Sequence, residues 1–220
     1  MPVVPQKVLV TGFEPFGGNA INPSGEIALA FDGKSIGSAR VVGRVLPCEF
    51  HKCDRLLPAL LKRHRPAAVV CLGLAGGRAG IHVERVAINV DDARIPDNAG
   101  IQPIDTPVVA GGPVAYWSTL PLKAIVAALR QAGVTAAVSQ TAGTFVCNHV
   151  FYLLMHTLAT GPARRGVRAG FVHVPWTPEQ PAAQDGQPSM ALAAQIAAVR
   201  SIIATTLTQP ELRVSGGAEH

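Results

Sequence analysis

Three residue types that lie far apart in this chain are those that a covalent hydrolase uses: a thiol, an imidazole and a carboxylate. The thiol is Cys147, which follows a turn of small residues at 141–144 and lies in the first turn of a predicted helix. Unpaired N–H groups and the positive end of the helix dipole favour a thiolate there, which is the nucleophilic form. Position alone leaves another interpretation open, because free cysteines are often small buried residues of a core.

His173 and Glu84 are the candidate partners of Cys147. His173 lies near the carboxyl end of one predicted strand, and Glu84 lies in the middle of another. Because successive βαβ strands are often neighbours, we expect the turns that hold Cys147 and His173 to be adjacent at one edge of the sheet. An imidazole within hydrogen-bond reach activates a thiol, and a carboxylate on its second nitrogen orients it. The pattern fits a Cys–His–Glu triad, although a lone glutamate on a strand is usually solvated.

Two histidines closer in sequence, His149 and His156, compete for the role of base. On a helix, His149 lies about 200° around the axis from Cys147, so the two side chains face opposite sides. We therefore interpret His149 as a residue of helix packing or of a structural hydrogen bond. His156 lies more than two turns beyond Cys147, and we interpret it as a core or rim residue.

The elements that would position these residues alternate between strands and helices along the chain. Strands are predicted at 7–11, 39–47, 67–74, 81–90, 134–139 and 167–176, and helices at 23–31, 53–65, 121–133, 189–208 and in the stretch that holds Cys147. This order predicts an α/β fold, a three-layer α/β/α sandwich around a mostly parallel twisted sheet. The alternation at 81–90 indicates an antiparallel excursion. We expect a single catalytic domain over 1–220, with a frayed C-terminal tail at about 209–220.

The loop after the first strand contains two phenylalanines, Phe13 and Phe16, but no nucleotide-binding glycine motif. The rings either pack under the loop as a small core, or form an exposed apolar slot for a planar ligand group. In the second case Asn19 or Asn22 would hydrogen-bond the edge of that group. The segment 91–113, which holds Arg94 and Asp97, is too long for an idle connection, so we expect it to carry function or disorder.

Composition excludes several classes of protein. Four cysteines in 220 residues are too few for a disulfide framework, and no signal peptide precedes the first strand, so we expect a reducing cytoplasm. No apolar run is long enough to span a bilayer. The net charge of +5 is scattered, with basic groups at 62–65 and 164–168 and few aromatics, which argues against nucleic-acid binding.

A zinc-like spacing of Cys48, His51 and Cys53 lacks a second ligand cluster. We therefore expect no metal and no cofactor. The spacing fits an ordinary junction between a loop and a helix.

Several long motifs occur in order along the chain: VLVTGFEPFGGNAINPS at 8–24, GLAGGR with VERVAINVDDARIPDN within 73–98, AGTFVCNHVFYLLMH at 142–156 and GFVHVPWTPEQ at 170–180. In these motifs the chain closely resembles the pyroglutamyl-peptidase I family, cysteine peptidases that remove an N-terminal pyroglutamyl residue. The resemblance implies that Cys147 is the nucleophile, His173 the base and Glu84 the third member of the triad. Backbone N–H groups at the helix start would meet the oxyanion, with possible support from Arg94.

The resemblance further implies that Phe13 and Phe16 pack about the pyrrolidone ring and that Asn19 helps to bind it. The partner would be a peptide or protein N-terminus bearing pyroglutamate, and the assembly a homotetramer. Two positions depart from the family pattern: Leu74 stands where many bacterial members carry Gln, and Leu153 where Gly is frequent. Two alternative functions stay open, a non-catalytic protein that binds a lactam or small ring at a vestigial site, and a nucleoside-phosphorylase-like enzyme.

Overall fold

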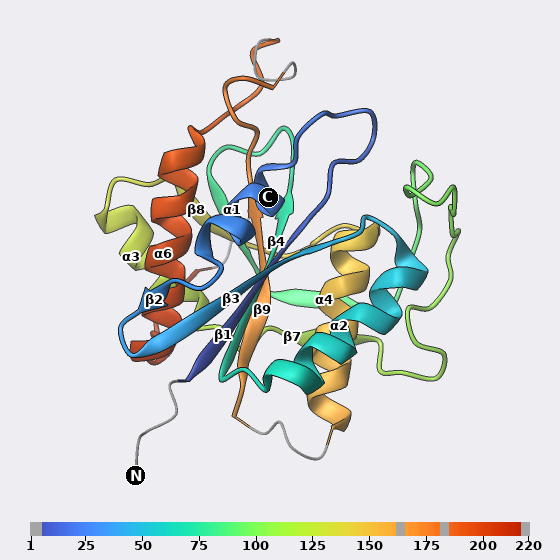
Figure 1. Cartoon of the computed structure of the whole chain (residues 1–220), viewed down its shortest axis with the longest axis horizontal. Helices are drawn as coiled ribbons and strands as arrows, with labels where there is room; N and C mark the ends of the chain where they lie inside the picture. Colours follow the sequence, from blue (N-terminus) through green and yellow to red (C-terminus); the bar gives the residue numbers. More distant parts are fainter. Residues whose placement is uncertain (1–5, 162–165, 181–184, 217–220) are drawn as a thin grey trace.

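A seven-stranded sheet forms the centre of the protein, with helices on both of its faces (Figure 1). The computed structural model describes residues 6–161, 166–180 and 185–216. Strands follow the order β2-β3-β1-β4-β9-β5-β8 across the sheet. Their bounds are Lys7–Phe13 (β1), Ser35–Ile36 (β2), Ala39–Leu46 (β3), Ala68–Leu74 (β4), Ile81–Glu84 (β5), Ala136–Ser139 (β8) and Arg168–Val174 (β9).

Most of the strand pairs in this sheet are parallel. The strands β3, β1, β4 and β9 all run in one direction, whereas β5 is antiparallel to β9 and parallel to β8. This confirms the predicted α/β class and its antiparallel excursion. The predicted strand 81–90 is divided at Arg85, after which β6 (Val86–Ile88) pairs with β7 (Ala115–Trp117) in a separate two-stranded sheet.

The strand that leads to Cys147, β8, was expected to lie next to the strand that carries His173, β9, and this expectation is wrong. β5 lies between β8 and β9 and pairs with both. The physical reason lies in the connection at 75–80, which is too short for the crossover that a parallel return requires. The chain therefore reverses after β4, and Gly77 and Gly80 adopt the positive φ angles of such a turn. As a result, the strand that carries Glu84 is the direct neighbour of the strand that carries His173.

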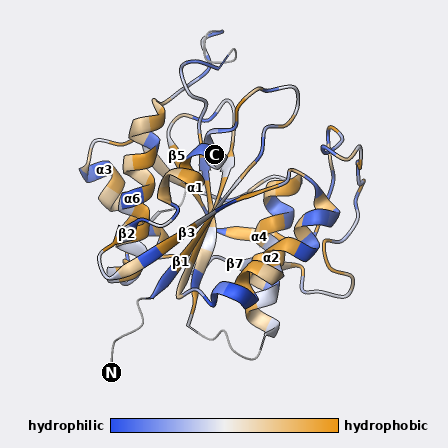
Figure 2. Ribbon diagram, in the orientation of Figure 1, coloured by the Kyte–Doolittle hydropathy of each residue, from blue (hydrophilic) through white to orange (hydrophobic). Residues whose placement is uncertain are grey.

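Two layers of helices cover the two faces of the sheet (Figure 1). One face packs against α1 (Pro23–Phe31), α3 (Leu122–Gln131) and α6 (Leu192–Thr208), and the other against α2 (Phe50–His64) and α4 (Val146–Thr160). Alternate residues of each central strand enter the two cores, so Val70 of β4 faces the first core and Cys71 the second. Figure 2 shows the resulting hydrophobic residues along the central strands.

Helix α2 starts earlier than the predicted 53–65. It begins at Phe50, whose N–H donates to Oδ2 of Asp97 at 3.0 Å, and it continues through Pro58. Cys53, in the first turn, donates its thiol to the carbonyl of Pro47 at 3.2 Å. Within the described ranges, no helix has both the length and the hydropathy needed to cross a bilayer.

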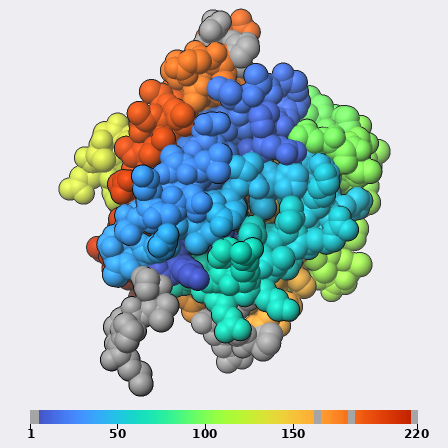
Figure 3. Space-filling model, viewed as in Figure 1, coloured from blue at the N-terminus to red at the C-terminus, as the bar shows by residue number. Residues whose placement is uncertain are grey.

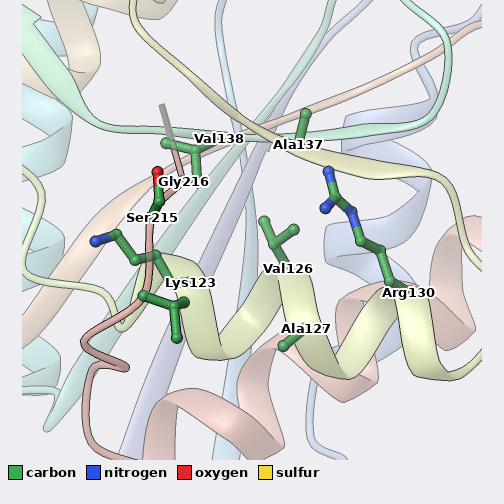
Figure 4. A pocket seen from close by; sticks show the side chains of 9 residues that line it. Lys123, Val126, Ala127, Arg130, Ala137, Val138, Ser215 and Gly216 are labelled. Atoms are coloured by element: carbon green, nitrogen blue, oxygen red, sulfur yellow. The ribbon is translucent and has the colours of Figure 1, made fainter. Parts of the chain in front are cut away.

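Part of the segment expected to fray, 209–216, makes defined contacts beside α3. The N–H of Lys123 donates to Oε1 of Glu211 at 2.9 Å, and Nη2 of Arg85 donates to the carbonyl of Gly216 at 3.2 Å. Figure 4 shows Ser215 and Gly216 next to Lys123, around a cavity of about 270 Å³. Residues 217–220 lie outside the described residues, as do 164 and 165 of the basic group at 164–168.

Candidate active site

Cys147 is the second residue of α4, and its sulfur lies over β4. No side chain caps the start of this helix, so the N–H groups of its first turn remain available as donors. A Cβ atom placed on Gly73 would come within 2.8 Å of Sγ of Cys147. Gly73 is the register partner of His173 in the parallel pair of β4 and β9, and paired residues project to the same face of a sheet. The thiol and the imidazole therefore lie on one face, over neighbouring strands.

His173 and Glu84 are in direct contact. Nδ1 of His173 lies 2.7 Å from Oε1 of Glu84, and both side chains are buried. The antiparallel register of β5 with β9 places His82 opposite His173, so Glu84 projects to the same face. Because Nδ1 donates to the carboxylate, a neutral His173 ring has its lone pair at Nε2. This is the tautomer that a general base requires.

The helix start favours a thiolate at Cys147, whereas burial of the thiol opposes it. Burial raises the pKa of its thiol to about 12, and the negative charge of Glu84 adds to the shift while Arg78 opposes it. Cys147 nevertheless keeps part of its surface exposed, whereas the other cysteines, Cys48, Cys53 and Cys71, are buried. A nucleophile at this position therefore needs a base to take its proton, and the helix N-terminus acts on the charge only as it develops.

His149 has a structural environment, as predicted. Its Nδ1 lies 2.8 Å from Oδ2 of Asp91, and its Nε2 lies 3.0 Å from Oδ1 of Asp54. Burial lowers the pKa of His149, but the two carboxylates outweigh it and raise that pKa to about 9. His156 lies farther along α4, where Nδ1 is 2.9 Å from the hydroxyl of Tyr116. Neither histidine has the geometry of a base for Cys147.

The two phenylalanines of the first loop differ in exposure. Phe13 is only 2% exposed, and its ring lies 6.3 Å from that of Phe171, so of the two alternatives a packed ring, and not an exposed one, holds for this residue. The reason is that Phe13 still belongs to β1 and points into the core. Phe16 is partly exposed and packs on Phe145, with 6.0 Å between the ring centroids. Asn22 caps α1 by accepting from the N–H of Ser24.

A cavity of about 510 Å³ opens beside Phe16. Its lining includes Asn19, Leu74, Arg94 and Trp176. Nδ2 of Asn19 donates to the carbonyl of Phe16 at 3.1 Å. The loop and the 91–113 segment lie side by side on the surface (Figure 3), where Nδ2 of Asn98 donates to Oε1 of Glu14 at 2.8 Å. The cavity therefore joins Phe16 and Asn19, two of the residues predicted to bind a ring, to Arg94, the predicted supporting arginine.

Comparisons with known proteins show which family this chain belongs to. A profile of the pyroglutamyl peptidase family matches residues 6–209. The chain belongs to the pyroglutamyl peptidase family. A pyrrolidone-carboxylate peptidase of Cupriavidus pinatubonensis is 59% identical over 216 residues, which cover 98% of this chain and 100% of that protein. The crystal structure of pyroglutamyl peptidase I from Bacillus amyloliquefaciens is similar with a TM-score of 0.92, at 42% identity over 96% of this chain and 100% of that one.

A hyperthermophilic relative shows the same fold. A mutant pyrrolidone carboxyl peptidase from Pyrococcus furiosus is similar with a TM-score of 0.88, at 45% identity over 92% of this chain and 98% of that chain. The pyroglutamyl peptidase fold thus extends across nearly the whole described chain.

Three residues of this pyroglutamyl peptidase site were missed in the sequence. Arg78 donates to Oε1 of Glu84, Phe145 packs on Phe16, and Trp176 lines the cavity. A signal existed for Arg78, since it is the one charge in the glycine-rich loop that follows a buried strand. Phe145 and Trp176 lie within the motifs at 142–156 and 170–180, but aromatic side chains at such positions are usually part of the core.

Proposed function

We propose that this chain hydrolyses the bond that follows an N-terminal pyroglutamyl residue, with Cys147 as nucleophile, His173 as general base and Glu84 as the group that orients it. The observation that carries the proposal is the 2.7 Å contact between Nδ1 of His173 and Oε1 of Glu84. His173 is the register partner of Gly73, and Sγ of Cys147 lies over Gly73. Membership of the pyroglutamyl peptidase family indicates the substrate class. The His173–Glu84 pair provides the oriented base that the reaction requires. The proposed reaction uses only side chains, backbone and water.

The first step forms a thioester. Nε2 of His173 takes the thiol proton as Sγ of Cys147 attacks the carbonyl carbon of the pyroglutamyl residue, and the carbonyl oxygen becomes an oxyanion. Backbone N–H groups of the uncapped first turn of α4 are the nearest donors to that charge. Arg94 is exposed and lines the adjacent cavity, so we propose it as a supporting cation. The oxyanion then re-forms the carbonyl, and the leaving amine takes the proton from His173.

The second step hydrolyses the thioester. His173 removes a proton from water as the water oxygen attacks the thioester carbonyl, and the same proton returns to the sulfur as the C–S bond breaks. Glu84 holds Nδ1 throughout and stabilises the imidazolium that each step forms. The products are free pyroglutamate and the resting thiol, which the raised pKa of Cys147 favours.

Recognition of the lactam requires apolar walls and a few fixed dipoles, since the ring is neutral. Phe16 and Asn19 line the cavity, and Phe13 lies in the core close to Phe171. Among the described lining residues no carboxylate is present, so the cavity offers no counter-ion to a free amino terminus. A polar pair matched to the lactam N–H and C=O would reject rings that lack either group. Leu74 lines this cavity with an apolar side chain.

We also propose that the enzyme is a cytoplasmic homotetramer. The four free cysteines fit a reducing compartment. Large apolar side chains are exposed in the segment before and within β7, where Val114 is 88% and Trp117 68% exposed, as is typical of a surface that a second subunit covers. Size-exclusion chromatography with light scattering measures the assembly, and a monomer at micromolar concentration would contradict it.

The decisive experiment compares Cys147→Ala with Cys53→Ala on a fluorogenic pyroglutamyl amide and a prolyl amide. We expect the wild type and Cys53→Ala to release the fluorophore only from the pyroglutamyl amide, and Cys147→Ala to release none. Turnover that survives in Cys147→Ala would exclude this nucleophile. Binding of the pyroglutamyl group without turnover by the wild type would instead favour the non-catalytic ring-binding alternative.

A further inference from the structure

Arg78 makes three contacts at the point where the proposed triad meets the turn that leads to Cys147. It lies in the loop between β4 and β5. Its Nη1 donates to Oε1 of Glu84 at 3.0 Å and to Oγ of Ser139 at 3.2 Å, and its Nη2 donates to the carbonyl of Thr141 at 3.2 Å. Its side chain is 31% exposed, whereas that of Glu84 is 0% exposed. This ion pair is therefore unlike a solvated surface pair, because one partner is wholly buried.

The geometry points to Arg78 as a positioning residue that fixes Oε1 of Glu84 toward His173 and joins this carboxylate to the turn before the Cys147 helix. The inference rests on the proposed function, because it assigns Arg78 a part in the same reaction. Oε1 of Glu84 accepts hydrogen bonds from both Nδ1 of His173 and Nη1 of Arg78. Two donors on one oxygen define the direction of the carboxylate far better than either donor alone.

The turn that Arg78 joins to the triad is ordered by its own hydrogen bonds. Oγ of Ser139 donates to the carbonyl of Thr141 at 3.0 Å, and the N–H of Gly143 donates to Oγ1 of Thr141 at 3.0 Å. Ser139 is also the register partner of Glu84 in the pair of β5 and β8. The guanidinium of Arg78 thus connects Glu84 to the turn that precedes α4. This turn sets the position of the start of α4, where Cys147 lies. A lysine has a single point of charge and lacks this planar fork.

The charge of Arg78 also acts on the protons of the site. The titratable and charged groups around the Glu84–His173 pair are Arg78, His82 of β5 and Cys147 of α4. Without the guanidinium, the Glu84–His173 pair would hold one proton more firmly, either on the carboxylate or as the imidazolium. In the first state the carboxylic acid donates to Nδ1 and the ring carries its own proton on Nε2, and in the second state both nitrogens carry a proton, so in both states Nε2 of His173 is unable to act as a base at that pH. Loss of Arg78 therefore moves the acidic limb of activity to higher pH.

The test uses three variants of the full-length protein: Arg78→Met, Arg78→Gln and Arg78→Lys. For each, kcat/KM on a pyroglutamyl amide is measured against pH, together with a thermal melt. We expect the acidic limb to move up by about one pH unit in the Met and Gln variants. In Arg78→Lys the limb stays close to that of the wild type because the charge is kept, while kcat falls because the contact with Thr141 is lost. The two neutral variants guard against one of them failing to fold.

His82 is a second group that Arg78 affects, since burial and the guanidinium both lower the pKa of this histidine. The shift is therefore measured again in a His82→Asn background, where it should persist. An acidic limb that does not move in either neutral variant overturns the inference, even where the variants are less stable. If the wild type does not cleave pyroglutamyl amides, the proposed function fails instead. The pH profile of Cys147 alkylation, which needs no turnover, then decides on Arg78 by the same shift.

Discussion

Two buried histidines of this protein each contact a carboxylate, but they differ in the number of nitrogens that are occupied. Nδ1 of His173 lies 2.7 Å from Oε1 of Glu84, and Nε2 of His173 has no carboxylate partner among the described residues. His149 has a carboxylate on each nitrogen, Asp91 on one side and Asp54 on the other. One carboxylate orients a ring and leaves a base, whereas two hold a proton on it and raise its pKa to about 9. The number of acidic partners therefore separates the histidine proposed as the base, His173, from the structural histidine, His149.

The structural histidine also helps to hold the catalytic region. His149 links α4 to α2 through Asp54 and to the segment after β6 through Asp91. The side chain of Asn148, next to it, accepts from the N–H of Ile88 and donates to the carbonyl of Val90. Three consecutive residues thus differ in what they contact: the thiol of Cys147 lies over the sheet, whereas the side chains of Asn148 and His149 anchor the start of the helix.

Exchanging each histidine for asparagine gives the largest expected contrast. In His173→Asn, kcat/KM on a pyroglutamyl amide should fall by about 1,000-fold, because the general base is lost while the fold is kept. In His149→Asn the activity per folded molecule should change far less. Steady-state kinetics with circular dichroism on both variants measures this, and equal losses of activity would remove the distinction between the two histidines.

Glu84→Gln tests the single acidic partner. We expect kcat/KM to fall by about a hundredfold, because a neutral amide no longer stabilises the imidazolium of His173. The matched control is Asp91→Asn, which should lower stability rather than turnover. Kinetics at several pH values measure the first change, and activity of Glu84→Gln equal to that of the wild type would contradict its role.

The double partnership of His149 predicts how stability depends on pH. The pKa of His149 is raised above its usual value of 6.5 to about 9 in the folded protein, so the folded state holds the proton more tightly than the unfolded state. The resulting stabilisation, up to about 3 kcal/mol, is fully present below pH 6.5 and is lost as pH rises to about 9. Denaturant unfolding at pH 6, 7.5 and 9 measures it. His149→Asn should lack this slope, and the same slope in both proteins would disprove its origin.

The smallest effect concerns the two acids that flank His149. Asp91→Asn should destabilise the fold by about 2 kcal/mol, because this carboxylate is buried. Asp54→Asn should cost less than about 1 kcal/mol, since 41% of this side chain is exposed and water screens its charge. Chemical denaturation of both variants at pH 6 gives the comparison. A larger loss of stability in Asp54→Asn would show that Asp54, and not Asp91, is the main carboxylate that stabilises the proton on His149.

Periodicity in the sequence predicted much of the fold because the long elements are strongly patterned. The buried run at 67–74 became β4, and Cys147 lies in the first turn of α4, as predicted. Strand direction was harder, because it depends on the length of the 75–80 connection and not on the pattern of β5. The adjacency argument for the site was therefore wrong, although it brought the right strands into consideration.

Site chemistry was less predictable than site identity. The helix start suggested a thiolate at Cys147, but desolvation is a property of the packed protein, and it raises the pKa of this thiol to about 12. Similarly, Arg78 stands six positions before Glu84 in the sequence, and only the folded loop brings the two together at 3.0 Å. The identities of Cys147, Glu84 and His173 followed from spacing and family resemblance, and their catalytic roles stay predictions until the variants above are measured.

Gly73 has a consequence for anyone who wishes to build this site into another protein. The sulfur of Cys147 and the ring of Phe171 both lie 2.8 Å from where a Cβ on this residue would be, far inside ordinary contact distance. Sγ of Cys147 therefore has space because Gly73, on the neighbouring strand, has no side chain. A designer who transplants the cysteine, histidine and glutamate onto another sheet must first remove the side chain beside the base, or the thiol will have no place to lie.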